Sequence, residues 1–208
     1  MDPAGRHALV TGGGSGIGAA IARALTGAGA RVTVLGRREA PLRAMLQSGD
    51  AAAIQQADVT DAAALRGAIA RAETELGPAA ILVNNAGAAE SAPFARTTRA
   101  LWDRMLAVNL SAAFEATQAL LPRMSGRGWG RVVNIASTAG LTGYPYVSAY
   151  VAAKHGLVGL TRALALECAR TDVTVNAVCP GFADTELLAG SIARIAEATG
   201  RSAEDARL

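Results

Sequence analysis

Lysine is almost absent from this chain. Of the 208 residues, 20 are lysine or arginine, and Lys154 is the only lysine among them. The arginines stand singly or in pairs, never in the runs that bind nucleic acid or anionic lipid. The formal net charge is only +3. We therefore expect no nucleic-acid partner, and we interpret the mild positive charge as an aid to solubility.

Cysteine is scarce as well, and long apolar runs are missing. Cys168 and Cys179 are too few for a disulfide framework, and no histidine or further thiol stands at metal-ligand spacing from them. No stretch is apolar over the length of a bilayer, and the first residues lack the apolar segment of a secretory signal. The sequence therefore predicts buried free thiols, no metal, no membrane span and a cytoplasmic location.

What the chain does contain is an alternation of short apolar runs and longer helical patterns. The runs are rich in β-branched residues without polar alternation, which favours strands covered on both faces, as in a parallel sheet. Six such units with helical crossovers predict an α/β fold, a doubly wound, Rossmann-like parallel sheet in a single domain over residues 1–208. The predicted strands are His7–Val10, Arg31–Leu35, Ala53–Val59, Ala80–Val83, Arg131–Ile135 and Val173–Val178. The predicted helices cover residues 16–28, 39–48, 61–76, 98–124 and 147–170.

A glycine-rich turn, TGGGSGIG at residues 11–18, follows the first predicted strand. Glycine lets the chain turn tightly, lets the backbone approach a pyrophosphate, and lets the following helix pack closely on the strand. The helix N-terminus offers N–H groups and the positive end of its dipole to phosphates. The spacing Gly12-x3-Gly16-x-Gly18 differs from G-x-G-x-x-G and also occurs in ordinary turns. Its place after the first strand nevertheless favours dinucleotide binding.

The end of the second predicted strand bears on which dinucleotide fits. A carboxylate there would bind ribose hydroxyls and repel a 2′-phosphate, whereas this chain has Arg37 and Arg38. Arginine offers charge-assisted contacts to phosphate, which favours NADP(H) and leaves NAD(H) as the alternative. Both arginines could instead be solvated loop charges paired with Glu39. Asp58, farther along, could accept a hydrogen bond from an adenine amino group or cap the helix that begins near Asp61.

The single lysine stands four residues after Tyr150, in a segment with a helical pattern. The two side chains would share one face and could meet. An ammonium about 4 Å from the phenol, at an effective dielectric near 20, would lower its pKa by roughly three units before desolvation is counted. The phenol would then exchange protons near the working pH. The alternative is an exposed lysine beside a core tyrosine.

Six elements, taken in order, resemble the short-chain dehydrogenase/reductase family. The similarity covers almost the whole chain and implies hydride transfer between NADP(H) or NAD(H) and a carbonyl or secondary alcohol. Within the family, the pattern is similar to 3-oxoacyl thioester reductases and 3-hydroxybutyrate-type dehydrogenases. The six elements are the turn at 11–18, Asn84-Asn85-Ala86-Gly87, Asn109, Ser137, Tyr150-x-x-x-Lys154 and Pro180-Gly181.

The resemblance implies a role for each of these positions. Tyr150 would be the general acid or base, and Lys154 would lower its pKa and hold the nicotinamide ribose. Ser137 would bind the substrate oxygen, and Asn109 would hold a water that relays protons. The implied cofactor contacts are Gly12, Ser15, Gly16, Ile17, Gly18, Arg37, Arg38, Asp58, Val59, Asn85, Ala86, Gly87, Tyr150, Lys154, Pro180, Gly181, Ala183 and Thr185.

Simpler explanations remain open for several of them. Ser137 could only cap a turn, Asn109 could mend a helix kink, and Thr185 could be a helix N-cap. A catalytically idle dinucleotide-binding or scaffold protein is the rival function.

The last part of the chain, residues 182–208, would form a lid over the substrate. Family members continue into another helix and a last strand, which this chain lacks as it ends at Leu208. We therefore expect either a fragment or a sheet edge covered by something else. The helices predicted at 98–124 and 147–170 would pair in a homodimer or homotetramer.

Overall fold

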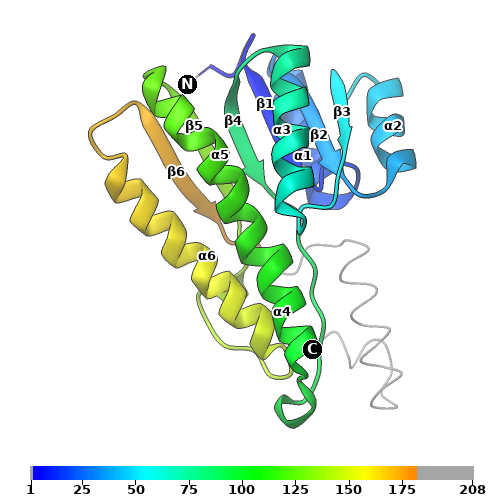
Figure 1. Ribbon diagram of the computed structural model, residues 1–208, viewed down its shortest axis with the longest axis vertical. Helices are drawn as coiled ribbons and strands as arrows, with labels where there is room; N and C mark the ends of the chain where they lie inside the picture. The colour runs from blue at the N-terminus through cyan, green and yellow to red at the C-terminus, as the bar shows by residue number, and fades with distance from the viewer. Residues whose placement is uncertain (1, 182–208) are drawn as a thin grey trace.

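A six-stranded parallel sheet forms the centre of the protein. The computed structural model describes residues 2–181, and within them the strands lie in the order β3-β2-β1-β4-β5-β6. The strands are β1 (His7–Thr11), β2 (Arg31–Gly36), β3 (Ala53–Gln56), β4 (Ala79–Asn84), β5 (Gly130–Ile135) and β6 (Val173–Val178). The order reverses between β1 and β4, where ligands bind in such sheets. The predicted doubly wound α/β fold is confirmed (Figure 1).

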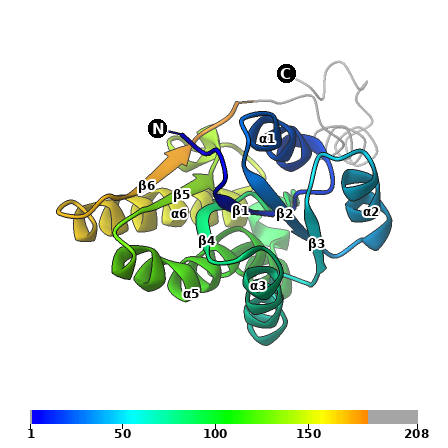
Figure 2. The same ribbon diagram turned by 90° about the horizontal axis from the view of Figure 1, so that it is seen from above.

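Helices cover both faces of this sheet. They are α1 (Gly16–Gly27), α2 (Glu39–Gln47), α3 (Ala62–Leu76), α4 (Arg99–Leu106), α5 (Ala112–Gly126) and α6 (Ser148–Glu167). Seen from above, α1 and α2 lie on one face, and α3, α5 and α6 lie on the other (Figure 2). The short turns η1 (Phe94–Arg96), η2 (Ala107–Ser111) and η3 (Thr138–Gly140) connect them.

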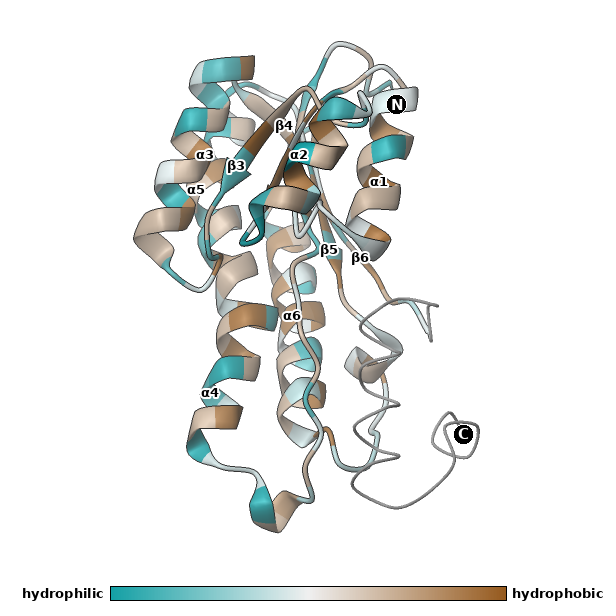
Figure 3. Cartoon of the chain, turned by 90° about the vertical axis from the view of Figure 1, so that its right-hand side faces the viewer, coloured by the Kyte–Doolittle hydropathy of each residue, from teal (hydrophilic) through white to brown (hydrophobic). Residues whose placement is uncertain are grey.

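The hydrophobic core has two main parts, one on each face of the sheet, because neighbouring residues of a strand point to opposite faces. Leu9 packs in the cluster with α3 and α5, whereas Ala8 and Val10 pack in the cluster with α1 and α2. All five residues of β1 are buried, as expected for a strand covered on both sides. Figure 3 shows helices α3 and α1, which carry hydrophilic residues, on either side of the strands.

The third strand is shorter than predicted. It ends at Gln56, not at Val59, although the Ala57 N–H still donates to the Gly36 carbonyl over 3.0 Å. The Asp58 carboxylate then accepts from the backbone N–H and the hydroxyl of Thr60, at 2.9 and 2.8 Å. Such local side-chain bonds compete with the strand ladder and turn the chain.

The helix predicted over 98–124 is interrupted. Helix α4 ends at Leu106, η2 is a π turn, and α5 begins at Ala112. The amide of Asn109, inside this turn, donates to the Met105 carbonyl over 3.0 Å and thereby satisfies an acceptor where the regular ladder breaks. The helix predicted over 147–170 extends only from Ser148 to Glu167.

The thiols are only partly as predicted. Cys168 is buried, but Cys179 is half-buried at the end of β6, and neither forms a disulfide. In residues 2–181 no helix is both long and apolar enough to cross a membrane. Across the same residues, no three histidine, cysteine or acidic side chains gather where a metal could bind.

His7 begins the central strand as a buried, neutral ring. Its Nδ1 lies 2.6 Å from the Gly77 carbonyl, which can only accept, so Nδ1 carries the proton. Nε2 then accepts from the Thr33 hydroxyl over 2.9 Å. Burial lowers the pKa of His7 below 6.5, outweighing the opposite effect of the Gly77 bond.

Stability should therefore fall as the solution is acidified. Unfolded His7 regains a pKa near 6.5, so the unfolded chain binds a proton that the folded protein resists. From pH 7.5 to 5.5, the unfolding free energy should drop by up to about 1.4 kcal/mol per pH unit below 6.5, until the lowered pKa is reached. Urea titrations at several pH values would measure this drop.

The chain has two histidines, which supplies a matched control. His155 is exposed, so His155→Gln should keep the pH slope, whereas His7→Gln should lose it whatever its absolute stability. An unchanged slope in His7→Gln would contradict this account.

Candidate functional site

Two features of the turn at residues 11–18 require glycine: a positive φ at some positions and a lack of space for a side chain at another. Gly12 and Gly16 have φ values of 64° and 53°, a region that glycine adopts without strain. A Cβ on Gly18 would lie 2.2 Å from the Gly12 carbonyl oxygen, so no side chain fits there. Ser15 precedes α1, and its side chain makes no capping bond with the first turn. Ser15 and Gly16 are exposed, which leaves the helix N-terminus accessible to an anion.

The loop after β4 is fastened to this turn. The Asn85 amide donates to the carbonyls of Thr11 and Gly12, at 3.0 and 3.2 Å. The Thr11 hydroxyl accepts from the backbone N–H groups of Asn85 and Ala86, at 3.0 and 3.1 Å. Thr11 was missed in the sequence; the available signal was a polar residue at the end of a buried strand. The two loops that flank the reversal of strand order thus form one rigid unit.

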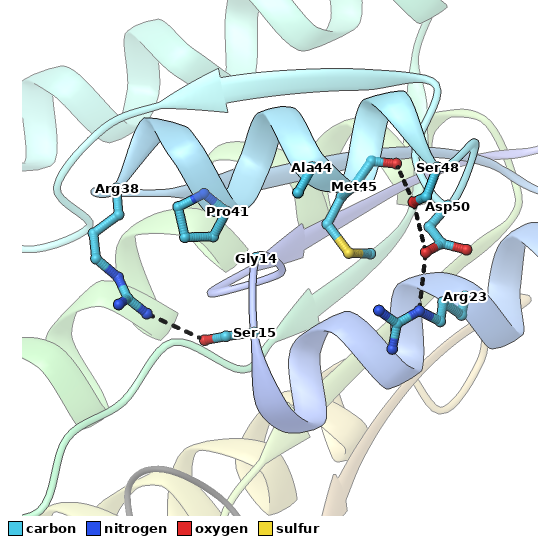
Figure 4. A pocket seen from close by; sticks show the side chains of 9 residues that line it. All are labelled: Gly14, Ser15, Arg23, Arg38, Pro41, Ala44, Met45, Ser48 and Asp50. Atoms are coloured by element: carbon cyan, nitrogen blue, oxygen red, sulfur yellow. Dashed lines mark hydrogen bonds and ion pairs between the residues drawn. The ribbon is translucent and has the colours of Figure 1, made fainter.

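A pocket of about 430 Å³ opens beside the glycine turn, between α1 and α2 (Figure 4). Gly14, Ser15 and Arg38 line one end, where an Arg38 Nη2 lies 3.5 Å from the Ser15 hydroxyl. Arg23 and Asp50 form an ion pair at the other end. The pocket therefore presents a guanidinium beside an open helix N-terminus, and both attract phosphate.

Arg37 and Asp58 face each other at the rim of this region. Their charged atoms are 4.0 Å apart, and both side chains are substantially exposed. Burial raises the pKa of the Asp58 carboxyl, but hydrogen bonds from Thr60 and the charge of Arg37 together hold it below its usual range. Asp61, and not Asp58, caps α3, because its carboxylate accepts from the first N–H groups of that helix. Glu39 pairs with Arg43.

Val59 and Ile17 contribute packing at the edges of this site. Val59 is buried in the core beside α3, and Ile17 packs against the core beneath α1. The Val59 side chain is therefore directed into the core, and that of Ile17 is partly buried.

Tyr150 and Lys154 lie one turn apart near the start of α6. Lys154 is only 4 % exposed, so the alternative of an exposed lysine is wrong. Its Nζ donates to the Ile135 carbonyl over 2.8 Å and lies 5.7 Å from the centroid of the Tyr150 ring. Burial lowers the pKa of Lys154 to about 8, against electrostatic interaction with Cys179, which raises it. The ammonium is nevertheless mostly charged at neutral pH.

The predicted lowering of the Tyr150 pKa is wrong for this arrangement. Burial raises the pKa of Tyr150 above 10, and the hydrogen bond with the Ser137 side chain opposes this only in part. Lys154 lies to the side of the ring and directs a donor at the backbone. Tyr150 therefore presents a neutral hydroxyl at neutral pH.

Ser137 both caps a turn and meets Tyr150. Its hydroxyl accepts from the Ala139 N–H over 3.1 Å at the start of η3, and it shares a hydrogen bond with the Tyr150 side chain. The N–H of Thr138 donates to the Pro180 carbonyl over 2.9 Å, which joins the ends of β5 and β6. Gly181 is exposed beyond it. Ala183, Thr185 and the predicted lid lie outside the described residues.

Asn109 satisfies a free carbonyl in the interrupted helix and is also hydrogen-bonded to the loop after β4. Its amide donates to the Ala88 carbonyl over 2.9 Å, and its Oδ1 accepts from the Ala88 N–H over 3.2 Å. A Cβ on Gly87 would lie 2.9 Å from Asn109 Oδ1 and 3.7 Å from Lys154 Nζ. The glycine turn, the β4 loop and the Tyr150–Lys154 pair therefore lie together beyond the carboxyl ends of β1 and β4, at the crevice where doubly wound sheets bind their ligands.

The sequence was compared with known families and proteins. The family model for short chain dehydrogenase matches residues 6–195. D-beta-hydroxybutyrate dehydrogenase of Cupriavidus necator is 42 % identical over 207 residues, covering 98 % of this chain and 80 % of that protein. Acetoacetyl-CoA reductase of Rhizobium meliloti is 44 % identical over 185 residues, covering 88 % and 76 %.

A similar solved structure is a variant of actinorhodin polyketide ketoreductase with NADPH. It has a TM-score of 0.91 and 39 % sequence identity, and the match covers 99 % of this chain and 81 % of that one. The chain therefore belongs to the short-chain dehydrogenase family, the members of which are nicotinamide-dinucleotide-dependent oxidoreductases.

Proposed function

We propose that this protein reduces the ketone of a 3-oxoacyl compound with NADP(H), and oxidises the corresponding alcohol in the reverse direction. The observation that carries the proposal is the hydrogen-bonded Ser137–Tyr150 pair beside the buried Lys154 ammonium. Relatives named D-beta-hydroxybutyrate dehydrogenase and acetoacetyl-CoA reductase support the 3-oxoacyl assignment. The bound dinucleotide supplies the hydride chemistry, and the protein supplies position and protons.

Tyr150 acts first as a proton donor in this proposal. A phenol whose pKa is raised by burial is protonated at neutral pH and can pass its proton to the oxygen of a carbonyl group as that oxygen becomes negative. Ser137 lies within hydrogen-bonding distance of the same hydroxyl and would stabilise the developing oxyanion. In the reverse direction Tyr150 would take the proton back.

The Lys154 ammonium has N–H donors available for the dinucleotide. An ammonium carries three N–H groups, and the Ile135 carbonyl occupies one of them. We assign the others to the nicotinamide ribose and to a proton-relaying water held near Asn109. Asn109 Oδ1 keeps a second lone pair after accepting from Ala88. The cation beside the phenol would also stabilise the phenolate that forms when Tyr150 has given up its proton.

Arginine at the end of β2 supports NADP(H) over NAD(H). Arg38 lines the pocket beside Ser15, and Arg37 flanks it on the exposed side. We assign the 2′-phosphate to these two guanidinium groups, and the remaining dinucleotide to the glycine turn, Asn85–Gly87 and Pro180–Gly181. Asp58 would meet the adenine.

A homodimer or homotetramer is part of the same proposal. Phe114 on α5 and Leu166 on α6 are exposed apolar side chains, 43 % and 78 % exposed, on the helices expected to pair. We also propose a cytoplasmic location, since both thiols are free.

Replacing Tyr150 with phenylalanine should abolish turnover and spare binding. Loss of the proton donor should lower kcat by about 100- to 10 000-fold. Titration of NADPH, followed by its fluorescence, should give an unchanged Kd, and absorbance of the reduced cofactor would report turnover of a 3-oxo ester. Tyr144→Phe removes the hydrogen bond to Thr138 and should cost at most about tenfold. A wild-type protein that binds NADPH but turns over no ketone would favour the scaffold function.

Replacing Arg38 with alanine should change cofactor choice. Loss of a charge-assisted bond to the 2′-phosphate should raise KM for NADPH by about 10- to 150-fold and leave KM for NADH within about threefold. Arg43→Ala, which removes a guanidinium paired with Glu39 on the same helix, is the matched control and should change neither. Equal losses for both dinucleotides would mean that Arg38 only shapes the loop.

A further inference from the structure

Two loops beside the Ser137–Tyr150 pair are tied together. The loop after β4 passes through Ala88 and Ala92, and the segment after η3 leads through Tyr146 into α6. The Ala92 N–H donates to the Tyr146 carbonyl over 2.7 Å. Ala88 is bonded in both directions to Asn109. Both loops are therefore held at fixed positions relative to the crevice.

Tyr146 adopts a strained backbone conformation. With a φ of 66°, it is the only non-glycine residue with positive φ among residues 2–181. An aromatic residue in this region costs about 1 kcal/mol or more, and such strain persists where the surrounding structure imposes it, often at functional sites. The bond from Ala92 imposes it here, and the side chain remains 64 % exposed. The strain therefore maintains an exposed ring four residues before Tyr150.

A second large apolar side chain is exposed on the segment after η3. Leu141 is 57 % exposed. A Cβ on Gly140 would lie 2.8 Å from the Lys154 carbonyl oxygen, so the turn that precedes Leu141 packs directly on α6. Leu141 and Tyr146 are called the apolar rim below. Exposed apolar side chains beside a site favour contact with apolar ligands.

The two loops tied together at this rim offer no cation. Residues 86–93 and 138–147 contain no lysine, arginine or histidine, and Glu90 is their one charged residue. Glu90 is bonded through both carboxylate oxygens to Arg104, at 3.2 and 2.9 Å. Farther along, Arg99 is bonded to both oxygens of Asp103. A free carboxylate moved from water to these loops would lose hydration without gaining a positively charged partner from them, which is costly.

We propose that the apolar rim selects uncharged 3-oxo esters and thioesters over free 3-oxo acids, with Tyr146 and Leu141 in contact with the acyl or alkyl arm. This inference rests on the proposed ketone reduction. It separates the protein from its 42 % identical relative named for hydroxybutyrate, an anion. The substrate ketone meets Ser137 and Tyr150, while its arm leaves the crevice between the two loops.

The first test compares two substrates that differ mainly in charge. For reduction with NADPH, kcat/KM for ethyl acetoacetate should exceed that for acetoacetate by at least about 100-fold, because loops 86–93 and 138–147 offer the anion no cation. Equal values, or preference for acetoacetate, would overturn the proposal.

The second test changes the rim and keeps the fold. Tyr146→Gly relieves the positive φ and should unfold at the same or a higher temperature, yet it should raise KM for ethyl acetoacetate about 5- to 10-fold by removing an apolar contact. Leu141→Ala should act in the same direction, and Tyr146→Phe should keep the wild-type KM. Leu46→Ala removes an exposed apolar side chain on α2 and should leave KM unchanged. A Tyr146→Gly protein with wild-type KM would show that the ring does not contact substrate.

A binding measurement separates failure of this inference from failure of the proposed function. Tyr150→Phe with saturating NADPH keeps the rim, so calorimetric titration should detect ethyl acetoacetate and give a much weaker signal with acetoacetate. Wild-type protein could turn over neither compound while Tyr150→Phe still binds ethyl acetoacetate more strongly than acetoacetate. The proposed reduction would then be wrong, and the selection of uncharged compounds by the apolar rim would be supported. If the two compounds bind with equal affinity, the proposed selection by the apolar rim is wrong even where turnover is observed.

Discussion

The hydrogen bonds between the Asn85 amide and the carbonyls of Thr11 and Gly12 hold the crevice together. Parallel pairing brings β1 and β4 side by side, but it does not by itself fix the loops that follow them against each other. A single amide, with the Thr11 hydroxyl, fixes one loop against the other. The absence of a Cβ on Gly18 then lets α1 approach the same point. The N-terminus of α1, the glycine turn and the β4 loop are thereby brought together where the strand order reverses.

Burial sets the acid–base chemistry more strongly than the neighbouring charge does. Tyr150 is kept protonated by its surroundings and Lys154 is brought to a pKa of about 8 by the same cause. Both shifts follow from removing the charged form from water. A dinucleotide-dependent oxidoreductase gains from this arrangement, because a neutral acid and a charged donor stand side by side at neutral pH without neutralising each other.

The fold and the proximity of Tyr150 to Lys154 could be predicted because their signals are local. Apolar runs indicated the strands, glycine marked the turn, and the four-residue step from Tyr150 to Lys154 put both on one helix face. The π turn at Asn109 could not be predicted, since a helical pattern of apolar residues continues through it. The direction of the Tyr150 pKa was also mistaken, because burial depends on packing from distant segments. The role of Thr11 could not be predicted, because its partner Asn85 is 74 positions away. The strain at Tyr146 likewise depends on Ala92, which is 54 positions away.

The single lysine has a practical consequence. Reagents that acylate primary side-chain amines find one target in the whole chain, and that target is 4 % exposed. The outer surface, where arginine carries the positive charge, stays unmodified. Mass spectrometry of the peptide that contains Lys154 would therefore record covalent labelling of this residue, with no background from surface lysines. The extent of labelling would report how accessible the Lys154 amine is to the reagent.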